Sequence, residues 1–292
     1  MAAGIGILYK DTEAYLQRFD AYHSHRHTTP DDQRIIGYRH QIDKMKMKNV
    51  STLRVLSIGS GDGERESLFI DAILSRCYPI DYVVIEPSGD YTEKFEALAK
   101  SKQDKGQWNS VKFEFRTMTL QAYLHEVGQM TKQPNFDIVH CRHSAYFFHD
   151  KAISTTLYGF LNDGGMLLIT VGCGTWESFG RYMKKTYEGV PDSGRIVLGA
   201  LSLMECLEQA LPRVHIEVAT NESSICFESF EEDSKEGNMV LDFLCATRDF
   251  RKVCSKDLFD KTMSYITENC LRIVDGKRYF IVDDEDFLIF KD

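Results

Sequence analysis

The stretch VLSIGSGDGERES, residues 55–67, decides the fold. A block of apolar residues typical of a buried strand runs into three glycines, Gly59, Gly61 and Gly63, and then into the polar start of a helix. Glycines at a strand end let backbone amides approach a ligand closely, at the edge where open α/β sheets bind ligands. They also suit a tight strand–helix turn without any ligand, so the loop alone is a weak signal.

The segments around this loop alternate between strand and helix patterns. Apolar runs rich in Val, Ile and Phe read as strands, and longer amphipathic segments between them read as helices. This alternation predicts an α/β fold with a mostly parallel, doubly wound sheet and helices on both faces. The expected order is strand 53–59, helix 66–78, strand 81–88, helix 91–102, strand 111–118, a strand from 136, helix 150–161, turn 162–165 and strand 165–172.

The two ends of the chain depart from this alternation. Helical spacing predicts an N-terminal cap of two helices, and after Trp176 the pattern loosens. We expect residues 1–190 and 265–292 to form the core with its cap, and residues 191–264 to form an accessory substrate-binding region. The expected outer elements are helices 11–27, 31–47, 181–187 and 201–211, strands within 215–229, an acidic turn at 231–238 and strands within 278–291.

Composition excludes several classes of protein. The 292 residues carry 35 Lys and Arg against 44 Asp and Glu, and the formal charge of −9 would repel nucleic acid. No apolar run approaches the roughly 18 residues of a membrane span. Charges come too early in the first residues for a signal peptide, so a cytoplasmic location is expected.

The cysteines and histidines do not predict a metal site. The eight cysteines form no CxxC pair and are expected to be reduced, mostly buried thiols. His23, His25 and His27 alternate, and alternate residues on a helix face different ways. We therefore expect no bound metal.

An acidic residue after the second expected strand supports a nucleoside ligand. The segment VVIEPS places Glu86 where a carboxylate can accept hydrogen bonds from both hydroxyls of a ribose. The loop reads G-x-G-x-G, whereas a dinucleotide fingerprint reads G-x-G-x-x-G. Asp62 and Glu64 would oppose a pyrophosphate but tolerate a sulfonium or an ammonium. These residues favour S-adenosyl-L-methionine as the cofactor.

The same segments carry a resemblance to a known family. VLSIGSGDGE, VVIEPS, VKFEF, FDIVHCRHSAYFFHD, GGMLLITVG and LDFL recur in the order and spacing found in the histamine N-methyltransferase family, over nearly the whole chain. The resemblance implies a Rossmann-like class I methyltransferase fold in two domains. It also implies a cytoplasmic, monomeric enzyme that methylates a ring nitrogen of a small imidazole and releases S-adenosyl-L-homocysteine.

The resemblance also assigns cofactor-binding residues. Three positions depart from the family: Tyr91 replaces a glutamine, Leu120 replaces a serine, and Arg142 replaces an apolar residue. The change at Arg142 could allow this arginine to bind a carboxylate of the substrate. The cofactor-binding set is Gly59, Ser60, Gly61, Gly63, Glu86, Ser88, Tyr91, Thr119, Leu120 and Arg142.

On the substrate side, aromatic residues are expected because their faces hold an imidazole and stabilise cations. For any one of them, ordinary core packing is the more usual explanation. The candidates are Tyr15, Phe19, Tyr22, Trp176, Phe179 and Phe243, with Tyr182 as a further aromatic near them.

The expected catalytic residues are His143, Asp283, Tyr146 and Phe147. His143 and Asp283 stand where the family has a glutamine and an asparagine, and Phe147 replaces a tyrosine. His143 either offers a ring donor or is a half-buried histidine bonded to backbone. Asp283 either binds a primary ammonium or takes the proton shed by the methylated ring, or else is a solvated turn carboxylate.

These residues leave three functions open. The first is an S-adenosyl-L-methionine-dependent N-methyltransferase acting on histamine or a close analogue. The second is a carnosine- or histidine-type imidazole N-methyltransferase, for which Arg142 would be the discriminating residue. The third is a catalytically silent homologue that binds the cofactor or an amine without turnover.

Overall fold

The computed structural model describes residues 12–46, 50–76, 78–147, 150–186 and 199–292. The chain divides into two compact units. Unit 1 comprises Met1–Thr28, Gly172–Ser202 and Thr220–Asp284, and unit 2 comprises Thr29–Val171, Leu203–Ala219 and Glu285–Asp292.

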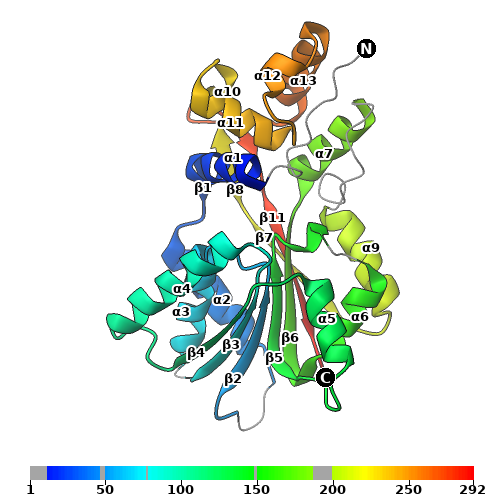
Figure 1. Cartoon of the computed structure of the whole chain (residues 1–292). Helices are drawn as coiled ribbons and strands as arrows, with labels where there is room; N and C mark the ends of the chain where they lie inside the picture. Colours follow the sequence, from blue (N-terminus) through cyan, green and yellow to red (C-terminus); the bar gives the residue numbers. More distant parts are fainter. Residues whose placement is uncertain (1–11, 47–49, 77, 148–149, 187–198) are drawn as a thin grey trace. The chain divides into compact units, whose positions relative to one another are not determined.

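Unit 2 is built on a mostly parallel sheet. Within the described residues it has seven strands in the order β4-β3-β2-β5-β6-β11-β7. The pairs β2–β3, β3–β4, β2–β5 and β5–β6 are all parallel, which confirms the predicted doubly wound α/β core (Figure 1). The strands are β2 (Leu53–Ile58), β3 (Ile80–Ile85), β4 (Val111–Arg116), β5 (Phe136–Arg142), β6 (Leu161–Gly172), β7 (Ile216–Asn221) and β11 (Asp284–Phe290).

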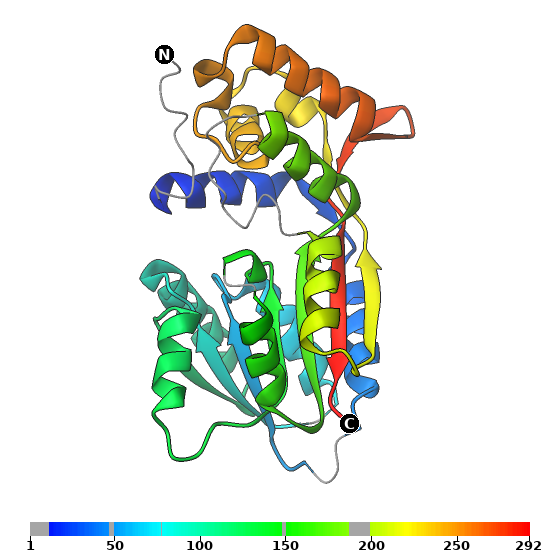
Figure 2. The same cartoon turned by 90° about the vertical axis from the view of Figure 1, so that its right-hand side faces the viewer.

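Helices cover both faces of this sheet, as Figures 1 and 2 show. The helices α2, α3 and α4 lie on one face, where their apolar residues share a core with β2 and β3, and α5 and α6 lie on the other. The turn expected at 162–165 falls within β6, and α5 was not expected. The helices are α2 (Asp31–Asp43), α3 (Glu64–Leu74), α4 (Gly89–Asp104), α5 (Leu120–Gly128), the 3-10 helix η2 (Ala145–Phe147), α6 (Lys151–Gly159) and α9 (Ala200–Ala210), most of which belongs to unit 2.

Unit 1 combines a small antiparallel sheet with helices around an aromatic-rich core. The strand order is β1-β8-β10-β9. The strands are β1 (Arg26–Thr28), β8 (Ser223–Cys226), β9 (Leu271–Val274) and β10 (Lys277–Ile281), and the helices are α1 (Thr12–His25), α7 (Gly174–Thr186), α10 (Glu228–Glu231), α11 (Lys235–Leu244), α12 (Phe250–Val253) and α13 (Lys256–Asn269).

The bounds of unit 1 differ from the accessory region expected at 191–264. The unit also takes α1, residues from Gly172 onward and residues 265–284, whereas Leu203–Ala219 fall in unit 2. The two expected cap helices are therefore divided between the units. The expected acidic turn is interrupted at Lys235, where α11 begins after its N-cap Ser234.

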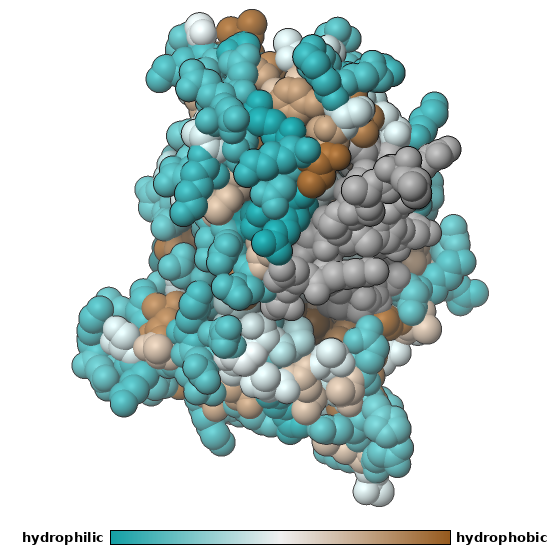
Figure 3. Space-filling view, turned by 45° about the horizontal axis from the view of Figure 1, so that its top comes forward, coloured by the Kyte–Doolittle hydropathy of each residue, from teal (hydrophilic) through white to brown (hydrophobic). Residues whose placement is uncertain are grey.

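On the face shown in Figure 3, the coloured residues are mostly hydrophilic, with apolar ones scattered among them. Exposed large apolar side chains lie on separate elements, such as Ile36 on α2, Leu201 on α9 and Ile273 on β9. Among the helices of the described ranges, none is both long and apolar enough to cross a membrane. Of the described cysteines, all are free thiols; Cys77 lies outside the described residues.

A buried ion pair holds α1 on α11 in unit 1. Arg18 Nε donates to Asp242 Oδ2 at 2.8 Å, and the two residues are 8% and 2% exposed. Asp242 also accepts the backbone N–H groups of Asp249 at 2.9 Å and Phe250 at 2.8 Å, so it fixes the start of α12. Burial raises the pKa of Asp242, and these hydrogen bonds oppose that effect. The carboxylate is thus the buried junction of three helices.

We predict that Asp242→Asn lowers the free energy of unfolding by about 3–5 kcal/mol, because it leaves the buried Arg18 guanidinium without its counter-charge. The matched control is Asp257→Asn on α13, which removes an exposed ion pair with Lys261 and should change stability by less than about 0.5 kcal/mol. Urea unfolding of both variants measures the difference. Equal effects of the two substitutions would contradict the structural role of Asp242.

Candidate functional site

The loop between β2 and α3 is shaped by its glycines. Gly59, Gly61 and Gly63 have φ values of +68°, +59° and +81°, which side-chain-bearing residues rarely adopt. A Cβ on Gly59 would lie 2.4 Å from Ser144 Cβ, and one on Gly63 would lie 2.1 Å from the ring of Phe95. A Cβ on Gly61 would meet no atom within 4 Å. The outer glycines are therefore needed for packing, and the middle one faces open space.

Glu86 connects this loop to the next strand. Its carboxylate follows β3 and is 5% exposed. Oε2 accepts the N–H of Gly61 and Oε1 accepts the N–H of Ser88, both at 2.9 Å. Burial raises the pKa of Glu86 and the charge of Asp62 adds to the rise, while the two backbone hydrogen bonds lower it. Each oxygen retains acceptor capacity for a ligand hydroxyl.

The loop lies at the point where the strand order of the sheet reverses. From β2 the chain continues to β3 and β4 on one side, and β5 then pairs with the opposite side of β2. Ser144, after β5, donates to the carbonyl of Ile58 at 2.5 Å, which ties the ends of β2 and β5 together. Ser60 hydrogen-bonds through its hydroxyl to Ser57 at 2.6 Å. Open α/β sheets bind ligands at such a point.

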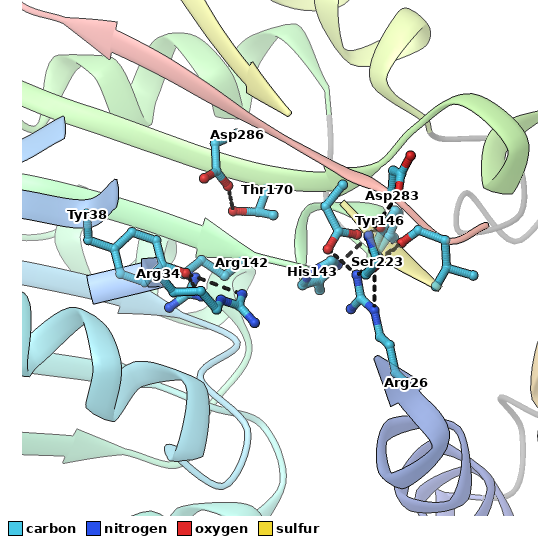
Figure 4. Close-up of polar contacts among 12 residues, drawn as sticks. Arg26, Arg34, Tyr38, Arg142, His143, Tyr146, Thr170, Ser223, Asp283 and Asp286 are labelled. Atoms are coloured by element: carbon cyan, nitrogen blue, oxygen red, sulfur yellow. Dashed lines mark hydrogen bonds and ion pairs between the residues drawn. The ribbon is translucent and has the colours of Figure 1, made fainter. Parts of the chain in front are cut away.

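His143 directly follows β5 and has an unusual backbone. Its φ of +57° lies in the left-handed region, which is uncommon for a residue other than glycine and which gathers at functional sites. Its N–H donates to the Thr170 carbonyl at 3.0 Å. Its Nδ1 lies 3.5 Å from the hydroxyl of Tyr146, and the planes of the two rings meet at 29° (Figure 4). The side chain of Phe147 lies outside the described part of the structure.

The hydroxyls of Ser88 and Thr119 serve as helix caps. Ser88 Oγ accepts the N–H of Tyr91 at 3.4 Å at the start of α4, and Thr119 Oγ1 accepts the N–H of Ala122 at 3.2 Å at the start of α5. Leu120 is buried. These residues have local structural roles. Their contact with a cofactor stays a prediction.

Arg142 is the last residue of β5, and its side chain has partners on α2 and α3. It is buried, donates from Nη1 to the Arg65 carbonyl at 3.0 Å, and bonds the hydroxyl of Tyr38 through Nη2 (Figure 4). Burial lowers the pKa of Arg142, but Tyr38, Glu66 and Asp286 outweigh this effect and raise the pKa above its usual value. This side chain holds α2 and α3 on the sheet, and its expected contacts with a cofactor or a substrate carboxylate stay predictions.

A buried polar cluster behind the glycine loop was missed from sequence. Tyr82 donates to Glu66 Oε2 at 2.8 Å, and His140 Nε2 lies 2.9 Å from the same hydroxyl. Burial lowers the pKa of His140 to about 4, so its ring is neutral at pH 7. Glu66 lies in the first turn of α3, and the cluster thereby ties the helix start to β3 and β5. The available signal was a histidine, His140, flanked by the apolar residues Val139 and Cys141 within a predicted strand.

In unit 1, most of the aromatic residues predicted to bind substrate gather around one ring. Phe243 of α11 lies 4.4 Å from Tyr22, 5.7 Å from Phe19, 6.0 Å from Tyr15 and 6.4 Å from Trp176, measured between ring centroids. Tyr15, Phe19 and Trp176 are only partly buried. These five residues form the aromatic cluster, a surface suited to a flat or cationic ligand.

Phe179 belongs to a different group of rings. It packs against Tyr182, Tyr265 and Phe280, and Tyr182 stacks on Tyr265 at 3.8 Å. Phe179 is fully buried. Its position favours core packing over the expected substrate contact.

Asp283 lies between β10 and β11 and is anchored by backbone. Its Oδ1 accepts the N–H of Ser223 at 2.8 Å (Figure 4). Burial raises the pKa of Asp283, and the charges of Glu222 and Asp284 add to the rise, whereas the hydrogen bond from Ser223 and the charge of Arg272 lower it. This carboxylate is half-buried and anchored, in contrast to a freely solvated turn residue.

Comparison with known proteins gives relatives at low identity. No family model matches the chain. It is 24% identical over 298 residues to histamine N-methyltransferase of Danio rerio, covering 96% of each chain. It is 26% identical over 212 residues to carnosine N-methyltransferase 2 of Gallus gallus, covering 68% of this chain and 62% of that protein.

Among solved structures, a mycolic acid cyclopropane synthase complexed with SAH and CTAB superposes with a TM-score of 0.52. Its sequence identity is 11%, and the match covers 100% of this chain and 99% of that one. The match confirms the predicted Rossmann-like class I methyltransferase fold. The resemblance in sequence is also confirmed: this chain is similar to histamine N-methyltransferases over most of its length.

Proposed function

We propose that this chain is an S-adenosyl-L-methionine-dependent N-methyltransferase that acts on a small imidazole or amine, with histamine or a close analogue as the preferred substrate. The observation that carries the proposal is the Glu86 carboxylate, joined to the N–H of Gly61 at the point where the strand order reverses. The similarity to histamine N-methyltransferases supports the choice of substrate.

The residues around Glu86 fit the cofactor. A buried carboxylate with two oxygens at this edge suits the paired hydroxyls of a ribose. The open space at Gly61 admits a ligand against the backbone. Asp62 and Glu64 supply negative charge, which favours a cationic sulfonium over a pyrophosphate. The cofactor supplies an activated methyl group and leaves as S-adenosyl-L-homocysteine.

The chain's own residues have little acid–base work in this reaction. An imidazole with a pKa near 6.5 is largely neutral at pH 7 and needs no strong base to act as a nucleophile. Orientation and exclusion of water are then the main contributions, worth up to roughly 7–11 kcal/mol in favourable models. In unit 2 we assign orientation of the acceptor to Tyr146 and His143, which follow β5. In unit 1, considered by itself, we assign ring binding to the aromatic cluster and the binding of an ammonium group to Asp283.

Two alternatives stay open. Similarity to a carnosine N-methyltransferase favours a second imidazole substrate class, although the buried Arg142 offers no support for a carboxylate contact. A silent homologue that binds without turnover is the other alternative. We further propose that the protein is a cytoplasmic monomer. We also propose that it does not bind nucleic acid, because its net charge of −9 would repel phosphate groups.

Product analysis tests the proposal directly. The protein is incubated with S-adenosyl-L-methionine and, separately, histamine, histidine or carnosine, and products are detected by mass spectrometry. A methylated product that depends on cofactor and protein, formed fastest from histamine, is expected. Faster product from carnosine or histidine would select the second class, and binding without any product would select the silent homologue.

We predict that Glu86→Gln weakens S-adenosyl-L-methionine binding by about 1.5–3 kcal/mol, because hydrogen bonds to a charged acceptor are lost. Calorimetry measures the dissociation constant. In the wild type, affinity should also fall on acidification at a higher pH than for an ordinary glutamate, because burial raises the pKa of Glu86 and only the ionised form accepts from both hydroxyls.

The control is Glu126→Gln at the exposed end of α5, which should leave cofactor affinity unchanged. Glu86→Gln should also remove most of the loss of affinity at acid pH. If it binds the cofactor as tightly as the wild type, the assignment of Glu86 to the ribose is wrong.

A methyl group on the middle glycine probes the same contact. Gly61→Ala meets no atom within 4 Å in the protein itself, so it costs stability only about 1–2 kcal/mol through its positive φ. If the cofactor packs on this backbone, affinity should fall by at least tenfold. The matched control is Gly37→Ala on α2, which also meets no atom within 4 Å. Unchanged affinity in Gly61→Ala would place the cofactor elsewhere.

A further inference from the structure

Arg26 joins two parts of unit 1 that flank Asp283. From β1, its Nη2 donates to Ser223 Oγ at 2.6 Å and to the Val282 carbonyl at 3.0 Å, and its Nε donates to the same Ser223 oxygen at 2.9 Å. The guanidinium also forms an ion pair with Asp284 (Figure 4 shows Arg26 beside Ser223 and Asp283). The Arg26 side chain is 3% exposed. One buried cation thus bridges β8 and the connection between β10 and β11.

These contacts surround Asp283 without using its carboxylate. Val282 and Asp284, its two chain neighbours, are both bound by Arg26. Ser223, the third partner of Arg26, donates its own N–H to Asp283 Oδ1. The Asp283 carbonyl accepts the N–H of Cys173 at 2.9 Å. Backbone and side chain of Asp283 are therefore fixed from both sides.

The charges around Arg26 leave Asp283 able to attract a cation. Arg26 is paired at contact distance with Asp284, which is buried. Glu222 and Asp284 add negative charge near Asp283, and the opposing charge comes from Arg272. Within the described residues, Asp283 Oδ2 accepts no hydrogen bond, whereas Oδ1 is held by Ser223. A half-buried carboxylate with one available oxygen in acidic surroundings suits an ammonium group.

We infer that Arg26 is a positioning residue that fixes Asp283 as the anionic contact for the ammonium group of a cationic amine substrate. This inference rests on the proposed function and names the part of the substrate that the site selects. A lysine at position 26 keeps the positive charge, but a single ammonium does not reproduce the planar fork that reaches Ser223, Val282 and Asp284 together. Weakening these guanidinium contacts should leave Asp283 less firmly positioned, without changing the contacts of the protein with the imidazole ring of the substrate.

The experiment compares two substrates that share a ring. Histamine carries an ammonium group, and 4-methylimidazole has the same ring without it. In Arg26→Lys, KM for histamine should rise roughly tenfold or more, the loss expected for weakening a hydrogen bond to a charged group. KM for 4-methylimidazole, kcat for histamine and the dissociation constant for S-adenosyl-L-methionine should stay within about twofold.

Two further variants serve as a positive comparison and as a control. Asp283→Asn should reproduce the selective loss for histamine. Arg278→Lys, in the same unit, alters an exposed arginine that pairs with Glu228 and Glu231 and should change neither KM. An equal rise in KM for both substrates in Arg26→Lys would show a general structural role and overturn the inference.

Calorimetry of histamine binding separates this inference from the proposed function. If the wild type binds histamine but forms no methylated product, the proposed function fails, and tenfold weaker binding by Arg26→Lys still supports the role of Arg26. Unchanged histamine binding by that variant, or a wild type that does not bind histamine, overturns the inference.

Discussion

The candidate cofactor site depends on one buried carboxylate. Glu86 accepts N–H groups from the loop after β2 and from the start of α4, and so holds two loops of the sheet edge together. Burying an ionised group is unfavourable unless hydrogen bonds compensate it, and here each oxygen accepts one backbone N–H. The same bonds fix the position of Gly61, whose backbone faces open space. A structural constraint and a binding surface are therefore supplied by the same atoms.

Features set by local sequence were predictable. An apolar run followed by glycines specifies a strand, a tight loop and a helix in order, and the acidic residue after β3 follows from chain order alone. Elements with weak local patterns were not predicted, such as the three-residue strand β1 and the start of α11 inside an acidic segment. Their placement depends on pairing with β8 and on the Arg18–Asp242 ion pair, which join residues far apart in sequence.

Side-chain direction was the least predictable part of the candidate site. Arg142 is the last residue of β5. Its position in the sequence does not show that its side chain points toward Tyr38 and the Arg65 carbonyl. Helical spacing placed Tyr15, Phe19 and Tyr22 on one face of α1, but their meeting with Phe243 required the fold of unit 1. Arg26 belongs to no recognisable sequence motif, because its three partners lie about 200 residues or more further along the chain.

A crystal structure of the protein with S-adenosyl-L-homocysteine tests the central claim most directly. The account predicts that the two ribose hydroxyls lie within roughly 2.6–3.2 Å of the Glu86 carboxylate oxygens, with the amino-acid part of the ligand against the backbone at Gly61. A ligand whose ribose lies away from Glu86, or that binds elsewhere in the chain, would contradict it.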